Sequence, residues 1–449
     1  MSTTISARFG ETAPRYTSYP TAPHFHPGIG PETVAAWMEH VEPDDAISLY
    51  LHIPFCDRLC WFCACHTKHT LRYEPVRDYL GSLHAEIATV SRLLGDRGRI
   101  RTVHFGGGSP TMLLPEDLIR LDRSLRDAFR YDDDAEVSVE IDPNDIDEGR
   151  LDALAAIGLT RASLGIQDFD PRVQKAINRE QSFEQTRAVV EGLRRRGVGS
   201  VNLDMLYGLP FQTRDSIRAT AEQVLTLYPD RIALFGYAHV PWFKKHQQMI
   251  DEAALPDANE RYVQSCLVSD LIQEDGFEAI GIDHFARPGD RLAIAAREGR
   301  LHRNFQGYTD DQCETMIGLG PSSVGKFRQG YAQNATATGQ YERMVGDGSL
   351  ATVRGIELGD EDRARAWIIE RLMCDFAFSC AEALNRFGEA AAAAIVEAGY
   401  RAAADPDRLL ERRGDLFVVT DAGRPLVRLV AAQFDQYLAT GNARHSVAV

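Results

Sequence analysis

The sequence of 449 residues predicts an α/β protein built on a partial (β/α)6 TIM-like barrel, with an N-terminal arm and a mostly helical, winged-helix-like C-terminal domain. Short β-type runs alternate with helical patterns, polar residues follow the runs at equivalent points, and helices dominate after residue 356. Strands that alternate with helices form a parallel sheet, and right-handed crossovers curl that sheet toward a barrel. We expect the arm over residues 1–35, the barrel over 36–355 and the helical domain over 356–449.

The barrel strands are predicted from six apolar or alternating runs. These runs cover residues 48–55, 101–107, 136–142, 161–167, 200–208 and 231–241. The segments between them, such as 75–95, 114–129 and 183–198, carry apolar residues at i, i+3, i+4 and i+7, which is typical of amphipathic helices. Six strands, each followed by a helix, are the units of a (β/α)6 arrangement.

Polar residues or glycines lie at the C-terminal end of the second to the sixth predicted strand. The C-terminal ends of parallel strands meet at one edge of the sheet, where α/β proteins carry their functional groups. We therefore expect one polar mouth. Its predicted members are Gly106, Gly107, Gly108, Glu140, Asp142, Gln167, Asp168, Asp204, Tyr207, Tyr237 and His239.

The segment after residue 356 is predicted to form a small separate unit. Its helical patterns end in a turn, a β-rich run with Asp-Ala-Gly and a closing amphipathic helix, which together resemble a winged helix. Winged helices often bind DNA, but the mixed charge of this segment favours a lid or docking role.

Composition excludes several classes of partner. The formal net charge is −16, from 49 basic and 65 acidic residues, which argues against nucleic acid or an anionic membrane. No apolar run reaches the roughly 18 to 20 residues of a membrane span. The N-terminus lacks the apolar region of a signal peptide. We expect a cytoplasmic protein.

Four cysteines on one short loop are the strongest chemical signal. Their spacing is Cys56-x3-Cys60-x2-Cys63-x-Cys65, directly after the first predicted strand. In the cytosol such a cluster indicates metal binding or catalysis rather than disulfides. Soft thiolate ligands at this density favour zinc or an iron–sulfur cluster.

The single tight loop favours a cluster over zinc. A structural zinc site usually takes two cysteine pairs separated by a dozen or more residues, so a zinc-stapled structural protein is the weaker alternative. Three thiolates from one loop can hold a [4Fe-4S] cubane and leave the fourth iron open. We interpret Cys56, Cys60 and Cys63 as the ligands. Cys65 is then free for another role, or is only a small buried hydrophobic residue.

The cysteine triplet with Phe62 before its last member resembles the signature of the radical S-adenosylmethionine superfamily. Further motifs follow in order along almost the whole chain: PRYTSYPT, HIPFC, HFGGGSPT, VSVEIDP, LGIQDF, NREQ, DMLYGLP and HRNFQGYT. Together they resemble the oxygen-independent coproporphyrinogen III oxidase family.

The resemblance implies two S-adenosylmethionine molecules beside the [4Fe-4S] cluster. The first would contact Tyr50, Gly107, Glu140 and Val324, and the second Phe62, Gly108, Ser109, Gln167, Arg179, Asp204 and Ala238. A guanidinium binds a carboxylate bidentately, which suits Arg179, although Arg179 and Asp204 could instead form an ordinary ion pair. Tyr50 and Cys65 are the implied catalytic residues. This chain departs from the family pattern at Trp61, Ser109 and Val324, where tyrosine, threonine and isoleucine are expected.

The resemblance also implies the reaction. A 5′-deoxyadenosyl radical would remove a hydrogen from the ring A and B propionates of coproporphyrinogen III, and loss of CO2 and an electron would give the vinyl groups of protoporphyrinogen IX. A reducing donor such as flavodoxin or ferredoxin, and a monomeric enzyme, are implied. The candidate cations for the substrate carboxylates are Arg15, His52, Lys68, Arg161 and Arg303.

The alternative function within the same superfamily is a haem chaperone or a haem-degrading relative. Such a protein would share the cysteine triplet and much of the barrel. Cys65, the arm with Tyr16 and Tyr19, and the FQGYT segment with Gln306 argue for the oxidase.

Overall fold

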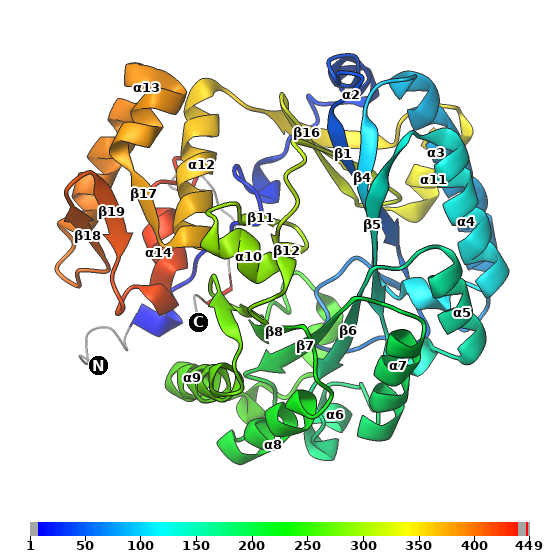
Figure 1. Ribbon diagram of the computed structural model, residues 1–449, viewed down its shortest axis with the longest axis horizontal. Coiled ribbons are helices and arrows are strands. Elements are labelled where there is room, and N and C mark those ends of the chain that lie inside the picture. The colour runs from blue at the N-terminus through cyan, green and yellow to red at the C-terminus, as the bar shows by residue number, and fades with distance from the viewer. Residues whose placement is uncertain (1–7, 439–445, 448–449) are drawn as a thin grey trace.

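The structure is a computed structural model that describes residues 8–438, 446 and 447. Its centre is an open sheet of twelve strands, covered on one face by a layer of helices, and a smaller unit of helices and strands lies beside it (Figure 1). The first seven residues of the predicted arm, and residues 439–445, 448 and 449 of the predicted C-terminal domain, lie outside the described residues. No helix in the described part of the chain has both the length and the apolar character needed to cross a bilayer.

Six adjacent strands of the sheet are parallel, as the sequence predicts. They are β1 (Ala46–Ile53), β4 (Arg99–Gly107), β5 (Tyr131–Ile141), β6 (Arg161–Gln167), β7 (Ser200–Tyr207) and β8 (Arg231–Gly236). Each pairs with the next one in this order, so the predicted α/β class is confirmed. The C-terminal ends of all six strands consequently meet at one edge of the sheet.

The sheet continues beyond both ends of this parallel set, which the sequence does not predict. On the side of β1 it continues with β13 (Thr315–Leu319), which is parallel to β1, and then β14 (Val324–Phe327), β15 (Gly330–Asn334) and β16 (Thr352–Glu357). On the side of β8 it continues with β10 (His284–Ala286) and β9 (Glu278–Ile280). These added strands have three to six residues, too few for a clear alternation of apolar and polar positions.

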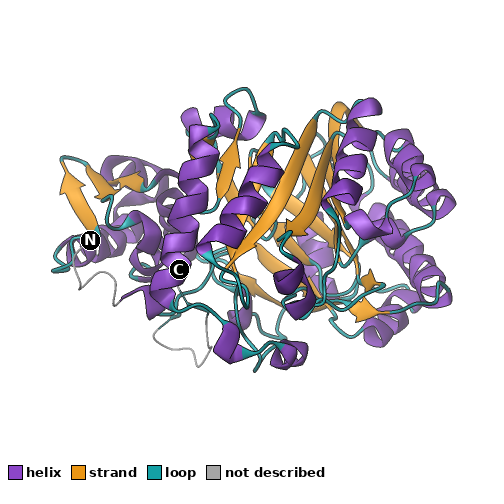
Figure 2. Ribbon diagram, turned by 90° about the horizontal axis from the view of Figure 1, so that it is seen from below, coloured by secondary structure: helices purple, strands orange, loops and turns teal. Residues whose placement is uncertain are grey.

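A layer of helices lies on the outer face of the sheet (Figure 2). They are α2 (Pro31–Met38), α3 (Glu74–Leu94), α4 (Pro115–Ala128), α5 (Glu148–Ala156), α6 (Pro171–Ala176), α7 (Phe183–Arg195), α8 (Arg214–Leu225), α9 (Ala258–Glu274) and α11 (Thr338–Gly346). The short helix α10 (Arg291–Arg297) lies instead between the sheet and the smaller unit (Figure 1).

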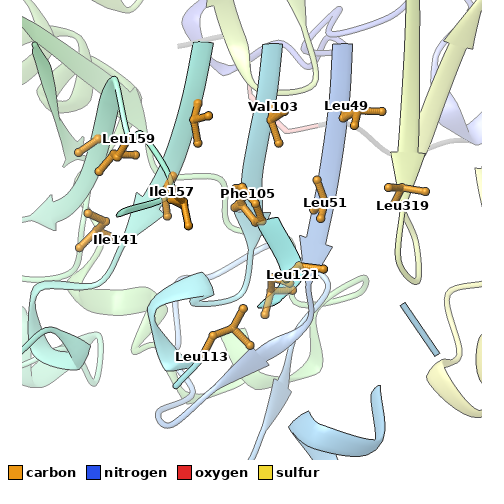
Figure 3. Close-up of a cluster of buried hydrophobic side chains, with 14 of the residues drawn as sticks. Leu49, Leu51, Val103, Phe105, Leu113, Leu121, Ile141, Ile157, Leu159 and Leu319 are labelled. Atoms are coloured by element: carbon orange, nitrogen blue, oxygen red, sulfur yellow. The ribbon is translucent and has the colours of Figure 1, made fainter. Parts of the chain in front are cut away.

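The two faces of the sheet differ because side chains alternate along each strand. Leu49 and Leu51 of β1 and Phe105 of β4 are buried in the core beneath the helices, close to Leu121 of α4 (Figure 3). The intervening side chains of β1, such as Tyr50, point to the opposite face. That inner face is polar, and it leads to the C-terminal edge.

The smaller unit combines the C-terminal segment with part of the arm. Phe9, Tyr16 and Tyr19 belong to its apolar core, and the Tyr16 hydroxyl donates to Asp435 Oδ2 at 3.1 Å. Its three short strands pair antiparallel in the order β17-β19-β18. Its elements are α12 (Asp360–Asp375), β17 (Ala377–Ser379), α13 (Cys380–Ala403), β18 (Leu410–Arg413), β19 (Leu416–Val419) and α14 (Val427–Ala432). The domain boundaries remain predictions.

A buried carboxyl group joins α3 to the loop after β13. Glu86 is 2% exposed and accepts hydrogen bonds from the Gly320 N–H (2.7 Å), the Tyr341 hydroxyl (2.8 Å) and the Asn334 amide (2.7 Å). Burial raises the pKa of Glu86 to about 7, although these three donors act to lower it. The loop that Glu86 holds leads into Val324, one of the predicted site residues.

The raised pKa of Glu86 predicts a pH dependence of stability. The folded protein retains a proton on Glu86 that the unfolded chain loses near its ordinary pKa of 4.5. The contribution of this group to the free energy of unfolding therefore falls as pH rises toward 7. Between pH 5 and 7 we expect the wild-type value to fall by about 2 kcal/mol more than that of Glu86→Gln. Denaturant unfolding of both proteins at the two pH values measures the difference, and parallel changes would contradict the assignment.

Candidate active site

The cysteine loop begins where β1 ends and is closed at its base. The short strands β2 (Phe55–Cys56) and β3 (Lys68–His69) pair in parallel on either side of the loop. The Lys68 N–H donates to the Pro54 carbonyl at 2.6 Å, and the Thr70 N–H donates to the Cys56 carbonyl at 3.0 Å. The loop between them is thereby presented at the C-terminal edge of the sheet.

The segment after α6 holds one side of this loop. The Trp61 N–H donates to the Ile177 carbonyl at 2.9 Å, and the Asn178 side-chain amide donates to the Leu59 carbonyl at 2.9 Å. The same segment carries Arg179, whose Nη1 lies 3.5 Å from Cys60 Sγ. The segment over residues 177–179, which is far from the cysteine loop in sequence, therefore holds the loop and also places Arg179 beside it.

The segment after β8 holds the other side of the cysteine loop. Lys244 Nζ donates to the Cys65 carbonyl (2.8 Å), and His246 Nε2 donates to the Cys63 carbonyl (2.7 Å). Gln247 bridges the two segments, because its side-chain amide donates to the carbonyls of Phe62 (2.8 Å) and Ala238 (3.2 Å). The loop is thus anchored to β8 as well as to β1.

The thiols of the loop differ in their electrostatic environment. Burial raises the pKa of Cys56, and it also raises the pKa of Cys60 against the opposing effect of Arg179. The hydrogen bond from the Cys65 side chain lowers the pKa of Cys63 to about 7, and the Cys65 N–H lies 3.3 Å from Cys63 Sγ. Metal ligation requires the thiolate, so these neighbours favour the ligating form of Cys63.

The three predicted ligands are thiols that one short loop carries within eight residues. In the described ranges no three His, Cys, Asp or Glu side chains converge as ligands of one metal ion would. A cubane does not need such convergence, because each cysteine binds a different iron atom. The donor set of soft thiols, with a guanidinium beside one of them, is compatible with a cluster whose thiolates carry negative charge.

The glycine run after β4 lies directly against the end of β1. The Gly108 N–H donates to the Ile53 carbonyl at 2.7 Å, and a Cβ on Gly108 would lie 2.4 Å from the Phe55 carbonyl oxygen. Gly107 has φ +111°, and a Cβ there would lie 2.6 Å from the His52 ring. Only glycine is compatible with both positions.

A carboxylate faces this glycine turn from β5. Glu140 Oε2 accepts from the Gly107 N–H at 2.9 Å, and its Oε1 lies 3.4 Å from His104 Nε2. Burial acts to raise the pKa of Glu140, but His104, Gly107 and His52 outweigh it, so the pKa is lowered. Glu140 is therefore an ionised acceptor beside the turn at neutral pH.

Tyr50 lies on the same inner face and is oriented by two histidines. Its ring stacks on His104 with centroids 5.8 Å apart, and its hydroxyl lies 3.1 Å from His52 Nδ1. His52 Nε2 donates to the His66 carbonyl at 2.8 Å, so Nδ1 is left to accept from Tyr50. Burial lowers the pKa of His52 to about 4. The imidazole is consequently neutral at physiological pH.

Arg179 pairs with Asp142 and not with Asp204, the partner that the sequence analysis considered. Its Nη1 binds Asp142 Oδ2 at 2.9 Å, and its Nη2 donates to the Gly165 carbonyl at 2.7 Å. The proposed alternative of an ion pair with Asp204 is therefore wrong. Arg179 is 8% exposed, and its Nε has no hydrogen-bond partner among the described residues.

Asp204 instead belongs to a polar group on β6 and β7. Its carboxylate accepts from Ser163 Oγ at 3.0 Å and from the Asn202 amide at 2.6 Å. Burial raises the pKa of Asp204 to about 6, against the effect of these donors. The negative charge of Glu140 also raises the pKa of Asp204, because the two carboxyl groups share the polar interior of the sheet.

The remaining predicted site residues lie around the same edge. Phe62 packs in an apolar cluster with Tyr237, next to Ala238. Ser109 is buried, and its hydroxyl donates to Asp145 Oδ2 at 2.7 Å. Gln167 ends β6 with φ +65°, and Val324 begins β14, next to β13. Their predicted roles toward cofactors stay predictions.

Cys65 and two of the candidate cations require correction. The Cys65 residue is exposed, so its interpretation as a small buried hydrophobic residue is wrong. His52 is neutral and does not supply a cation. Arg161 begins β6 at the opposite end of the strand and pairs with Glu136 at 3.2 Å, so it does not lie at the mouth.

Several residues that organise the site escaped the sequence analysis. Lys244 precedes a short 3-10 helix (Lys245–Met249) that carries His246 and Gln247. Their common role depends on contact with main-chain carbonyls far away in sequence. His104 was detectable in principle, because it occupies an inward position of a predicted strand just before the glycine run.

Comparison with known proteins agrees with this geometry. The family model of the radical SAM superfamily matches residues 50–224. An oxygen-independent coproporphyrinogen III oxidase of Paracoccus denitrificans is 48% identical over 442 residues, covering 98% of this chain and 97% of that protein. The protein of the same name from Bradyrhizobium diazoefficiens is 46% identical over 446 residues, covering 99% of both chains. The solved structure of coproporphyrinogen III oxidase (HemN) from Escherichia coli, a radical SAM enzyme, matches with a TM-score of 0.90 and 37% identity, over 94% of this chain and 97% of that one.

Proposed function

Because this chain belongs to the oxygen-independent coproporphyrinogen III oxidase family of the radical SAM superfamily, we propose that it converts coproporphyrinogen III into protoporphyrinogen IX in haem biosynthesis. It is an oxidoreductase that decarboxylates the propionates of rings A and B to vinyl groups. The observation that carries this proposal is the clamped cysteine loop, which lies at the end of β1 and contacts Arg179.

The cofactors are a [4Fe-4S] cluster, held by Cys56, Cys60 and Cys63, and S-adenosylmethionine, of which two molecules bind. When bound, they supply a 5′-deoxyadenosyl radical that takes up one hydrogen atom from the substrate. The protein must supply orientation and charge around them. The fit of the thiols and the narrow glycine turn support this assignment.

The first S-adenosylmethionine contacts Tyr50, Gly107, Glu140 and Val324. The ionised Glu140 carboxylate accepts hydrogen bonds from a cationic amino group, and the Gly107 turn allows close approach to the main chain. Tyr50 is held by His52 and His104, so its hydroxyl keeps one orientation near the reacting carbon. Tyr50 acts with Cys65 as a catalytic residue.

The second S-adenosylmethionine contacts Phe62, Gly108, Ser109, Gln167, Arg179, Asp204 and Ala238. Arg179 has an Nε–H without a partner in the described structure, which supports a role toward a carboxylate. Asp204 supplies an acceptor for hydroxyl or amino groups. These residues, on the cysteine loop and at the ends of β4 to β8, would hold the second molecule.

The overall chemistry requires a partner that carries electrons. A propionate that loses a β-hydrogen atom, one electron and CO2 becomes a vinyl group, so every decarboxylation releases one electron to an acceptor. Starting each cycle consumes one electron from a reducing donor such as flavodoxin or ferredoxin. We infer a monomeric, cytoplasmic enzyme with no nucleic-acid partner.

An anaerobic incubation distinguishes the oxidase from a haem chaperone. The reduced protein is mixed with coproporphyrinogen III, S-adenosylmethionine and an electron acceptor, and a parallel sample is titrated with haem. We expect protoporphyrinogen IX in the first sample. Stoichiometric haem binding without any product would favour the haem chaperone over the oxidase. Metal analysis and a visible spectrum test the cluster separately, and zinc without a brown chromophore would exclude it.

A further inference from the structure

A cavity rich in arginine lies between the barrel and the smaller unit. It has a volume of about 340 Å³ and is bordered by the ends of β7 and β8, by α9 and by the C-terminal unit. Its charged lining consists of five arginines and two aspartates: Arg15, Arg261, Arg303, Arg424, Arg428, Asp270 and Asp283. A cavity with this excess of cations favours an anionic ligand.

Arg303 is the central residue of this cavity. It lies on the hairpin of β11 (His302–Asn304) and β12 (Gly307–Thr309), where it stacks on Tyr308 with 4.4 Å between the guanidinium carbon and the ring centroid. Its side chain is only 5% exposed, yet its Nε and Nη1 have no hydrogen-bond partner among the described residues. Buried donors of a charged group are costly unless an acceptor reaches them.

Asp283, the acid that pairs with the Arg303 guanidinium, does not satisfy these donors. Asp283 Oδ1 lies 3.6 Å from Arg303 Nη1 and 2.7 Å from His284 Nδ1, so one carboxylate is shared between two partners. Burial acts to raise the pKa of Asp283, but Arg303, His284 and Arg15 lower it to about 2. Asp283 is therefore already ionised and engaged, and the cations around it still outnumber the acids.

Arg15 adds a second guanidinium from the arm. Its Nη2 donates to the Gly236 carbonyl at the end of β8 at 3.0 Å, and its side chain remains accessible along the cavity wall. The surrounding protein partly desolvates Arg15 and lowers its pKa; Asp283 opposes this shift, and the charge of Arg303 adds to it. An anion between the two guanidinium groups would relieve this repulsion.

A larger cavity on the other side of the hairpin provides a contrast. It has a volume of about 610 Å³ and shares only Arg303 with the first cavity. There Arg300, Arg328 and Arg371 are paired with Glu298, Glu314 and Asp375. These three arginines of the second cavity already have acidic partners, whereas Arg15 of the first cavity donates to a main-chain carbonyl, which favours the first cavity as the anion site.

The arginine cavity adjoins the candidate active site. Tyr207 and Tyr237 line it, and they lie three residues after Asp204 and directly before Ala238. Both Asp204 and Ala238 belong to the proposed cofactor contacts. A ligand group in the cavity therefore lies on the side of the strand ends at which the substrate is expected.

We propose that this cavity binds a propionate carboxylate of the tetrapyrrole substrate, with Arg303 and Arg15 as its donors. The inference rests on the proposed function, because coproporphyrinogen III carries four propionates. The volume lies at the lower end of the range for drug-sized ligands, which suits the carboxylate edge of a tetrapyrrole rather than its whole ring system. Guanidinium groups bind carboxylates through paired N–H donors.

Binding of a non-reactive porphyrin tests the cavity directly. Coproporphyrin III and its tetramethyl ester are titrated by fluorescence into cluster-loaded wild-type protein, Arg303→Gln and Arg15→Gln at one detergent concentration. We expect the affinity for the free acid to fall about tenfold or more in each variant, and the affinity for the uncharged ester to stay unchanged. The KM for coproporphyrinogen III should rise in parallel.

Arg287→Gln is the matched control. Arg287 also pairs with one aspartate, Asp275, and covers one aromatic ring, Phe277, but it does not line the cavity. This variant should bind both porphyrins as the wild type does. Unchanged affinity for the free acid in both test variants, or equal loss of acid and ester binding, would overturn the cavity assignment while wild-type turnover persists. A wild type that neither binds nor converts the tetrapyrrole would overturn the proposed function itself.

Discussion

Cys60→Ser is expected to remove the [4Fe-4S] cluster and to abolish turnover. Cys60 is 8% exposed, and Arg179 Nη1 lies 3.5 Å from its sulfur, so this ligand lies in the interior of the loop. A serine hydroxyl is a harder ligand that does not replace a thiolate at iron. Iron and sulfide content and the visible absorption of the anaerobically purified variant measure the loss.

Cys65→Ser is the matched control within the same loop. Cys65 is exposed, its main chain is held through Lys244 and Cys63, and its side chain hydrogen-bonds to Cys63. We expect this variant to retain the cluster absorption and to lose about a hundredfold in turnover if its thiol transfers a proton. Loss of the cluster in Cys65→Ser, or its retention in Cys60→Ser, would show that the ligands are assigned wrongly.

Gly108→Ala is expected to have the second largest effect. The added Cβ would lie 2.4 Å from the Phe55 carbonyl oxygen and 2.8 Å from the Ile53 carbonyl oxygen, and both are main-chain atoms beside the cysteine loop. The turn must therefore shift, and misplacement by about 1 Å can cost a hundredfold in rate. S-adenosylmethionine binding and turnover of the cluster-loaded variant measure this effect.

The control for this substitution is Gly81→Ala in α3. A Cβ on Gly81 would meet no heavy atom within 4 Å, and alanine favours a helix more than glycine does. We expect Gly81→Ala to retain full turnover. Equal activity of the Gly108 and Gly81 variants would refute the close approach at the glycine turn.

The parallel core of the fold could be predicted because its signals are local. Each of the six parallel strands (β1, β4, β5, β6, β7 and β8) is an apolar or alternating run, and the polar residues near its end mark the functional edge. The flanking strands were missed because they are short. The contribution of the arm to the C-terminal core was missed because contacts such as Tyr16 with Asp435 connect residues 419 positions apart.

The roles of the predicted site residues stay predictions, but the structure shows which of these residues lie together and which partners they have. The cysteine triplet and the glycine run lie together at the expected edge. The partner of Arg179 could not be chosen from the sequence, because Asp142 follows β5 and Asp204 lies on β7, and both strands are neighbours of β6. The neutral state of His52 likewise follows from burial, which the sequence does not display.

The family assignment indicates which anion the arginine cavity binds, because the substrate of this family carries four propionates. An acidic chain with a net charge of −16 must concentrate cations where an anionic substrate binds. Arg15 and Arg303 are far apart in the sequence, yet they line one cavity beside β8. The contact of the arm with the end of β8 therefore brings Arg15 to the proposed anion site.

Release of labelled CO2 tests the central claim most directly. Coproporphyrinogen III labelled in the propionate carboxyl groups is incubated anaerobically with the reduced, cluster-loaded enzyme, S-adenosylmethionine and an electron acceptor. Decarboxylation of rings A and B predicts two CO2 and two 5′-deoxyadenosine molecules for each protoporphyrinogen IX formed. Cleavage of S-adenosylmethionine without release of CO2 would contradict the assignment.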